Sequence, residues 1–210
     1  VFSTIIASSL IKANAAETEK AVTLIQGEKT SQYDTVQEAV AAVSADKTQA
    51  VITLNKDFEG AGAVVKKDQN IVFNLNGFTW TINSLVGSSG TETNGVQLLQ
   101  GSTVTIENGT LTSKTASKLI QNYCDLTIRN ATLSGQDNLT EIIVSNNNGS
   151  TVITGNSTVQ AAAGGIAFDS DKWGGYQGYY GAGFLCRCGW PGCIPKYLIS
   201  RRAEGQKYCN

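Results

Sequence analysis

The 210-residue chain contains no histidine and no methionine, and only two prolines. Without histidine there is no imidazole to act as a general base near neutral pH or to bind zinc. A complete reading frame starts with methionine, so the sequence is expected to be a fragment or to have lost its start. Blocks of like charge are also absent, and the formal net charge is -1, so nothing favours nucleic acid or an anionic membrane as a partner.

The first segment, residues 1–15, is apolar or small and ends in Ala13-Asn14-Ala15, which has the A-x-A form of a signal-peptidase site. We expect this segment to be the end of a secretory signal whose start is missing, with an apolar helix packed on the domain as the alternative. It is too short to span a bilayer. We therefore expect a secreted or cell-surface protein, in which residues 16–32 lead into the main domain.

One helix is predicted, between Asp34 and Asp46. Thr35 and Glu38 have the spacing of a capping box, in which a hydroxyl and a carboxylate satisfy backbone N–H groups at the helix start. Apolar residues then recur at the spacing that gives a helix one buried face. These residues are Val36, Ala39, Val40 and Val43.

After the helix come short segments that are rich in Val, Ile and Thr and are separated by Asn, Gly, Ser and Asp. Many alternate apolar and polar residues, as strands do when one face is buried and the other solvated. The predicted strands are residues 50–54, 71–75, 78–82, 96–99, 103–106, 110–113, 125–128, 141–144 and 151–153.

Three segments repeat one pattern, in which an Asn is followed by Thr two positions later and by Leu or Val three positions later. The asparagines are Asn108, Asn130 and Asn156, so the repeats lie 22 and then 26 residues apart. In an earlier, shifted copy, Leu75 and Trp80 are five residues apart, as are Ile106 and Leu111. We therefore expect Leu75 to align with Ile106 and Trp80 with Leu111. A period in the twenties, made of short strands and turns, is typical of a parallel β-solenoid.

Stacking accounts for the repeated residues, because successive coils of a solenoid lie about 4.8 Å apart and place equivalent side chains in columns. We expect Ile106, Ile128 and Ile153 to form an apolar column, and the three asparagines a structural column of turns with a left-handed backbone. Two alternatives remain. The same asparagines, with Asn138 and Asn148, match the N-glycosylation pattern, and an antiparallel sandwich also has short strands and regular turns.

The order of these features resembles the pectin-lyase-like family, in the form found in secreted and surface proteins of bacteria. The resemblance rests on the segments YDTVQEAVAAV, AVITLNKDFEG, NIVFNLNGFTWTI and TVTIENGTLTS and covers residues 33–170. It implies an all-β fold, a right-handed parallel β-helix, with the N-terminal α-helix capping the open end of the apolar column.

The resemblance also implies what the family's enzymes would need. Polygalacturonase-like members use clustered Asp residues with a His, and lyase-like members use calcium held by several carboxylates together with a basic residue. Here Arg129 is the only Arg before residue 170, and Asp125 and Asp137 lie on different turns. Lys114 and Lys118 could replace the arginine from one predicted loop, although solvation of an exposed turn is the simpler interpretation. We expect no catalytic residues, no cofactor and no metal site.

Residues 171–210 differ from the rest in composition. They contain no Thr and no Val, but both prolines, five of the seven tyrosines and four of the five cysteines. The repeat is expected to stop at residue 170. The tail is interpreted as out-of-frame or unstructured sequence, as a disulfide-bonded segment, or as a metal site, although zinc sites usually have two C-x2-4-C pairs. The cysteines are Cys186, Cys188, Cys193 and Cys209.

The tail also carries a Gly-rich segment, WGGYQGYY, with four aromatic side chains. Aromatic residues are good contact surfaces for partners because they combine an apolar body with a polar tip. Covering the last coil is the alternative role. These candidate ligand-contact residues are Trp173, Tyr176, Tyr179 and Tyr180.

Two classes of function remain. The first is a non-catalytic extracellular β-helix module, adhesin-like or stalk-like, that contacts a polysaccharide or a host or cell-surface protein. The second is the N-terminal part of a polysaccharide lyase or glycoside hydrolase whose catalytic coils lie outside this sequence. The absence of histidine and the scarcity of arginine favour the first class.

Overall fold

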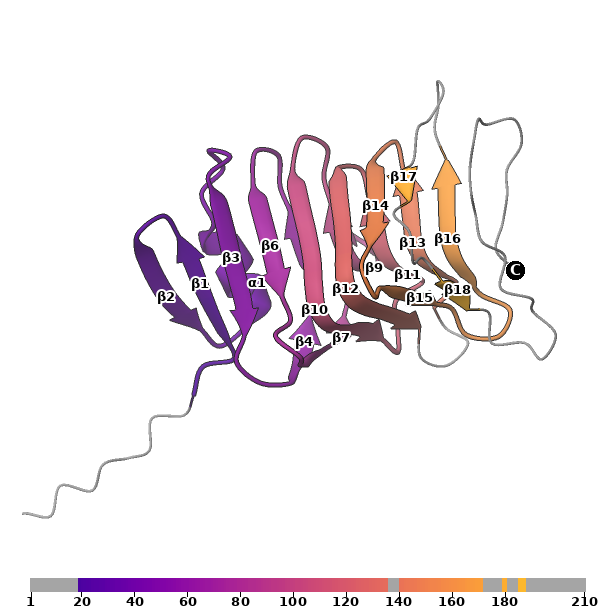
Figure 1. The fold of residues 1–210 in the computed structure, drawn as a ribbon, viewed down its shortest axis with the longest axis horizontal. Coiled ribbons are helices and arrows are strands. Elements are labelled where there is room, and N and C mark those ends of the chain that lie inside the picture. The colour runs from indigo at the N-terminus through magenta and orange to yellow at the C-terminus, as the bar shows by residue number, and fades with distance from the viewer. Residues whose placement is uncertain (1–18, 136–139, 172–178, 181–184, 188–210) are drawn as a thin grey trace, which may run out of the picture.

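The computed structural model describes residues 19–135, 140–171, 179–180 and 185–187, the last two stretches as backbone only. Two sheets run along the molecule, and each receives strands from successive coils of the chain (Figure 1). Strands equivalent by position pair in parallel from one coil to the next. The prediction of a parallel β-solenoid is therefore confirmed, and the antiparallel sandwich is excluded.

The larger sheet has the central order β14-β12-β10-β6-β3. Its parallel strands are β3 (Gln49–Leu54), β6 (Asn70–Asn74), β10 (Thr103–Ser113), β12 (Asp125–Gly135) and β14 (Ser150–Thr154). Three shorter strands extend this sheet. They are β7 (Thr79–Ser84), which pairs with the second half of β10, β15 (Thr158–Gln160), which pairs with that of β12, and β4 (Phe58–Ala61), which pairs with β7.

The smaller sheet has the order β16-β13-β11-β9-β5. These parallel strands are β5 (Ala63–Val65), β9 (Thr91–Leu98), β11 (Lys118–Asn122), β13 (Ile142–Asn147) and β16 (Ile166–Asp171). One short strand, β8 (Val86–Ser88), pairs antiparallel with β9. The side chains that the two sheets turn toward each other form the core.

The predicted isoleucine column is confirmed. Ile106 is in register with Ile128, and Ile128 with Ile153, and each is at most 1% exposed. Phe73 and Ile52 extend the column toward the N-terminus. The predicted strands 103–106 and 110–113 form one continuous strand, β10, and not a hairpin.

The expected alignment of Leu75 with Ile106 is wrong, because Phe73 occupies that place in the register. Trp80 does match Leu111 as expected. The difference arises from a longer turn, in which Phe78 N–H donates to the carbonyl of Leu75 at 2.8 Å. The two residues inside this turn both have positive φ, a conformation that asparagine and glycine tolerate best.

Turns at this corner differ in length between coils although the flanking strands keep their register. The corner takes residues 75–78 after β6, but only residues 108–109 within β10 and 130–131 within β12. Residues 155–157 follow β14. An alignment of the repeats by their turn residues therefore differs from an alignment by their paired strand residues.

Helix α1 (Val36–Ala42) begins with the predicted capping box, in which Thr35 Oγ1 accepts from Glu38 N–H and Glu38 accepts from Thr35 N–H. Its apolar face is buried as expected: Val36, Val40 and Val43 are each at most 5% exposed. The helix contacts β3 and β5, the first parallel strand of each sheet, and β1 and β2.

The end of α1 is tied to the solenoid by a buried glutamine. Gln69 Nε2 donates to the carbonyl oxygens of Val40 and Val43, both at 3.0 Å. These carbonyls belong to the last turn of the helix, where backbone acceptors lack partners within the helix. Gln69 Oε1 in turn accepts from Lys66 N–H, so the side chain joins helix and sheet.

Within the segment 16–32, which is expected only to lead into the domain, the described residues form most of a hairpin. Strands β1 (Val22–Gln26) and β2 (Lys29–Tyr33) are antiparallel, and Gly27 has positive φ at the turn between them. β1 pairs antiparallel with β3, so the larger sheet reverses its pairing at this end. β2 is the edge strand there, and four of its five residues are exposed.

Parallel pairing does not end at residue 170. β17 (Tyr179–Tyr180) pairs with β14, and β18 (Leu185–Arg187) pairs with β15. Strand pairing uses backbone groups, so a change in side-chain composition need not stop it. The part of the chain that the structure describes contains no helix with the length and apolar character needed to cross a bilayer.

Candidate functional site

The three asparagines of the repeat do not occupy equivalent backbone positions. Asn108 and Asn130 have left-handed φ values of 59° and 51°, whereas in the third repeat Gly155 takes this conformation, with φ of 64°. Asn156 follows it, and its N–H donates to Asn130 Oδ1 at 3.0 Å. Asn108 Nδ2 donates to Asn74 Oδ1 at 3.4 Å. These contacts hold neighbouring turns together.

A second asparagine pair, which sequence reasoning missed, lies in the interior of the smaller sheet. Asn122 and Asn146 are in register on β11 and β13, and each is at most 1% exposed. Asn122 Nδ2 donates to Asn146 Oδ1 at 2.7 Å, and Asn146 Nδ2 donates to Ser170 Oγ at 3.4 Å. The column is apolar in the earlier coils, where Leu98 and Val65 hold the equivalent places.

Asn122 also satisfies groups outside its own strand. It donates to the carbonyl of Ser150 at 3.0 Å and to Thr151 Oγ1 at 3.1 Å, and it accepts from Cys124 N–H at 2.9 Å. A signal for the pair exists in the sequence, since LIQN at 119–122 and IVSN at 143–146 share two apolar residues followed by a polar residue and Asn.

The basic residues considered for catalysis lie apart. Arg129 donates from Nε and Nη2 to Glu107 Oε2 on the adjacent strand, which forms an ion pair on the outer face of the larger sheet. Lys114 lies in a turn, whereas Lys118 is the first residue of β11. The two lysines therefore do not lie in one loop, contrary to the expectation. Asp137 lies outside the described residues.

Carboxylates are also dispersed. Asp125 begins β12 and accepts from Ser150 Oγ at 2.5 Å, which links it to the next coil. The described residues contain no group of three or more His, Cys, Asp and Glu side chains placed to hold a metal ion.

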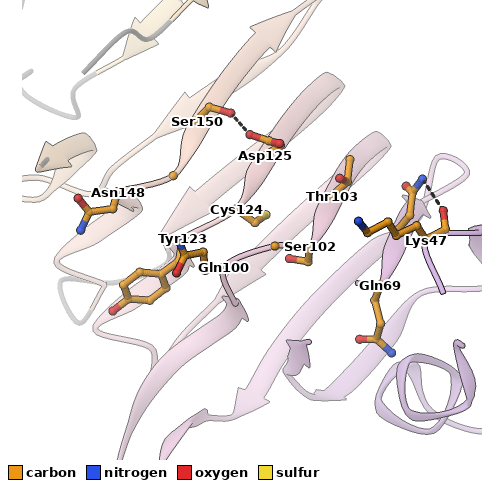
Figure 2. Close-up of a pocket in the computed structure, with 13 residues that line it drawn as sticks. Lys47, Gln69, Gln100, Ser102, Thr103, Tyr123, Cys124, Asp125, Asn148 and Ser150 are labelled. Carbon is orange, nitrogen blue, oxygen red and sulfur yellow. Dashed lines mark hydrogen bonds between the residues drawn. The ribbon is translucent and has the colours of Figure 1, made fainter. Parts of the chain in front are cut away.

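A groove runs along the corner where the chain passes from the smaller to the larger sheet. It encloses about 510 Å³ and is lined by the turns that precede β3, β6, β10, β12 and β14. Figure 2 shows Lys47 at one end and Tyr123 and Asn148 at the other. We call it the turn groove; the side chains that matter below are Lys47, Gln100, Thr103, Tyr123, Asp125 and Asn148.

Backbone hydrogen bonds link the neighbouring turns at the turn groove. Lys47 N–H donates to the carbonyl of Asp68 at 2.8 Å, and Asp68 N–H donates to that of Gly101 at 3.0 Å. Ser150 N–H donates to the carbonyl of Cys124 at 2.8 Å. These bonds join backbone groups alone and use none of the side chains at the groove.

Cys124 lines the turn groove and carries a free thiol, and the residue is buried. Burial raises its pKa to about 12, because the low-dielectric surroundings disfavour the thiolate, and the neighbouring carboxylate of Asp125 adds to the rise. Since the thiolate is the reactive form, this position is not a nucleophile near neutral pH.

Comparison with known proteins adds no assignment. No family model, curated protein or solved structure matches the chain. The pectin-lyase-like resemblance thus stays an inference from the sequence.

Most candidate residues of the tail lie outside the residues that the structure describes. Trp173 and Tyr176 lie outside the described residues, as do Cys188, Cys193 and Cys209. The backbones of Tyr179 and Tyr180 form β17, and that of Cys186 lies in β18 opposite Val159.

Proposed function

We propose that this chain is a non-catalytic β-helix module of a secreted or cell-surface protein, which serves as a stalk and contacts an extracellular polysaccharide or another surface protein. The observation that carries the proposal is that polar side chains of the chain bind one another between coils. Glu107 binds Arg129, Asn122 binds Asn146 and Asp125 binds Ser150, each pair between adjacent coils. Such pairs hold a rod together.

Cleavage of an acidic polysaccharide needs different chemistry. A group must transfer a proton at the reacting carbon or oxygen, and positive charge must stabilise the developing anion. Arg129 is the only arginine before residue 170, and its guanidinium already forms an ion pair with a carboxylate. Its use as a base or an anion clamp would require that ion pair to break.

The test is to incubate the 210-residue chain with polygalacturonate, with and without calcium. Absorbance of the unsaturated product reports elimination, and new reducing ends report hydrolysis. We expect neither. Turnover that disappears in Arg129→Ala or Lys118→Ala would contradict the proposal and favour the alternative, a part of a polysaccharide lyase or hydrolase.

Export is tested separately. With a start methionine and basic residues placed before Val1, a bacterial host should secrete the protein, and N-terminal sequencing should begin at Ala16. Replacing Ala13 and Ala15 with Lys should block this processing, because signal peptidase requires small residues there. A mature protein that keeps residues 1–15 would contradict the secretory assignment.

A further inference from the structure

We propose that the turn groove binds an extended, neutral oligosaccharide, with Tyr123 stacking against one sugar ring and the polar side chains around it bonding to hydroxyl groups. The inference rests on the proposed function, because it supplies the surface through which a non-cleaving module would hold a glycan. The volume of the turn groove, about 510 Å³, lies within the range of small-molecule sites, roughly 300–1,000 Å³.

The shape of the turn groove favours a chain over a single ring. It crosses the starts of β3, β6, β10, β12 and β14, which are consecutive neighbours in the larger sheet. Four interstrand spacings of about 4.8 Å give it a length of roughly 19 Å. A linear oligomer can follow that path along the solenoid axis (Figure 2).

The polar groups of the turn groove match hydroxyls, which both donate and accept hydrogen bonds. Gln100, Thr103 and Tyr123 make no side-chain hydrogen bond within the described residues, so both their donors and their acceptors are available to a ligand. Asn148 uses Nδ2 to bind Asn147, which leaves its carbonyl oxygen to accept. One aromatic ring among such groups suits a sugar, which presents polar edges and an apolar C–H face.

Other ligand classes fit less well. The lining charges are one lysine, Lys47, and one carboxylate, Asp125, so an anionic chain would gain one attraction and meet one repulsion. An apolar ligand would find a single large apolar surface, the ring of Tyr123, among amides and hydroxyls. A neutral, hydroxyl-rich polymer avoids both problems.

The experiment measures binding of four hexasaccharides to the full chain by calorimetry: cellohexaose, mannohexaose, laminarihexaose and, as the anionic probe, hexagalacturonate. We expect at least one neutral probe to bind. Tyr123→Ala should weaken that binding about tenfold, equivalent to ~1.4 kcal/mol, whereas Tyr123→Phe keeps the ring and should stay within about threefold.

Two further variants isolate the site. Asn148→Gly, on the exposed turn of the next coil, removes the amide and keeps a residue that tolerates the positive φ of 59° at this position. It should weaken binding even if Tyr123→Ala folds poorly. Glu59→Gln is the matched control, because Glu59 lines a separate hollow of about 460 Å³ on β4 and β7 and should leave affinity unchanged. The melting temperature of every variant shows whether the fold is intact.

Three results would overturn the inference: no neutral probe binds at about 1 mM, folded Tyr123→Ala and Asn148→Gly bind as tightly as the parent, or hexagalacturonate binds more tightly than every neutral probe. Cleavage of a bound probe is a different outcome. It would contradict the proposed function while leaving the turn groove as the binding site, so the two failures can be told apart.

Discussion

Asn122 and Asn146 face each other across adjacent coils, and the amide of the first donates to the carbonyl oxygen of the second over 2.7 Å in a site closed to solvent. A primary amide is both a donor and an acceptor, so identical side chains stacked in register can bond in series. A shift of either strand by one residue would move its asparagine to the other face of the sheet. The pair therefore specifies the register of β11 and β13.

Asn122→Ala should lower the free energy of unfolding by about 3 kcal/mol, because each buried group left without a partner costs ~1–3 kcal/mol. The change would leave the Cys124 N–H and the Ser150 carbonyl without the bonds they make to Asn122. Urea unfolding measures the effect. Asn83→Ala, at an exposed position on β7, is the control and should change stability by less than about 0.5 kcal/mol. Equal effects would mean that the buried pair does not stabilise the fold.

The positive φ of Asn130 predicts a difference between two asparagines that the sequence pattern treats alike. Asn130→Ala should destabilise by roughly 1–2 kcal/mol, the usual cost of a left-handed conformation for a residue with Cβ, and it also removes the acceptor for Asn156 N–H. Asn156→Ala should be nearly neutral, because the contact that Asn156 makes uses its backbone. Thermal unfolding of both variants checks this. The reverse order would show that Asn156 is the constrained residue.

Val40→Asp tests whether the buried face of α1 belongs to the core. An unpaired carboxylate at this position, which is 4% exposed, should cost several kcal/mol, about 3 or more. Ala41→Asp places the same charge on the exposed side of the same helix and should be far milder. The melting temperatures of the two variants give the comparison. If the melting temperature of Val40→Asp equals that of the parent protein, the helix does not contribute to the core.

The raised pKa of the buried Cys124 thiol predicts a loss of folding stability at alkaline pH. Its folded pKa of about 12 lies above that of an unfolded thiol, so between about pH 9 and 12 the unfolded chain releases a proton that the folded chain retains. Unfolding is then favoured as pH rises, by up to ~1.4 kcal/mol per pH unit. The stabilisation is fully present below about pH 9.

The measurement compares chemical unfolding of the parent protein and Cys124→Ala at several pH values in this window. The difference in slope between them isolates the thiol from the lysines and tyrosines, which titrate in both proteins. Parallel slopes would contradict the raised pKa.

The parts of the fold that follow from local pattern could be predicted from the sequence. The column of Ile106, Ile128 and Ile153 follows because alternation sets the buried face and the period sets the stacking. The start of α1 follows because a capping box is a contact between residues three apart. Neither requires knowledge of distant segments.

Features that depend on pairing between distant segments could not be predicted. The strand β2 is exposed and polar, and it becomes a strand only because β1 offers it an edge. The sequence does not show that Phe73, and not Leu75, aligns with Ile106, because turn length varies while strand register does not. The turn groove is built from Gln100, Tyr123 and Asn148, which share no motif, since what places them together is the stacking of their backbones.

The variable corner after β6, with residues 75–78 where the next coil needs only 108–109, has a consequence for engineering. Although this corner is two residues longer, Phe73 and Trp80 stay in register with Ile106 and Leu111. A peptide epitope grafted between Asn76 and Gly77 should therefore leave the flanking strands in register, while it displaces the bonds that Asn76 Nδ2 makes to the Leu54 carbonyl and Gly77 N–H makes to that of Asn108. Each corner of this kind is an independent insertion point, and several could carry different peptides at fixed spacings along one rod.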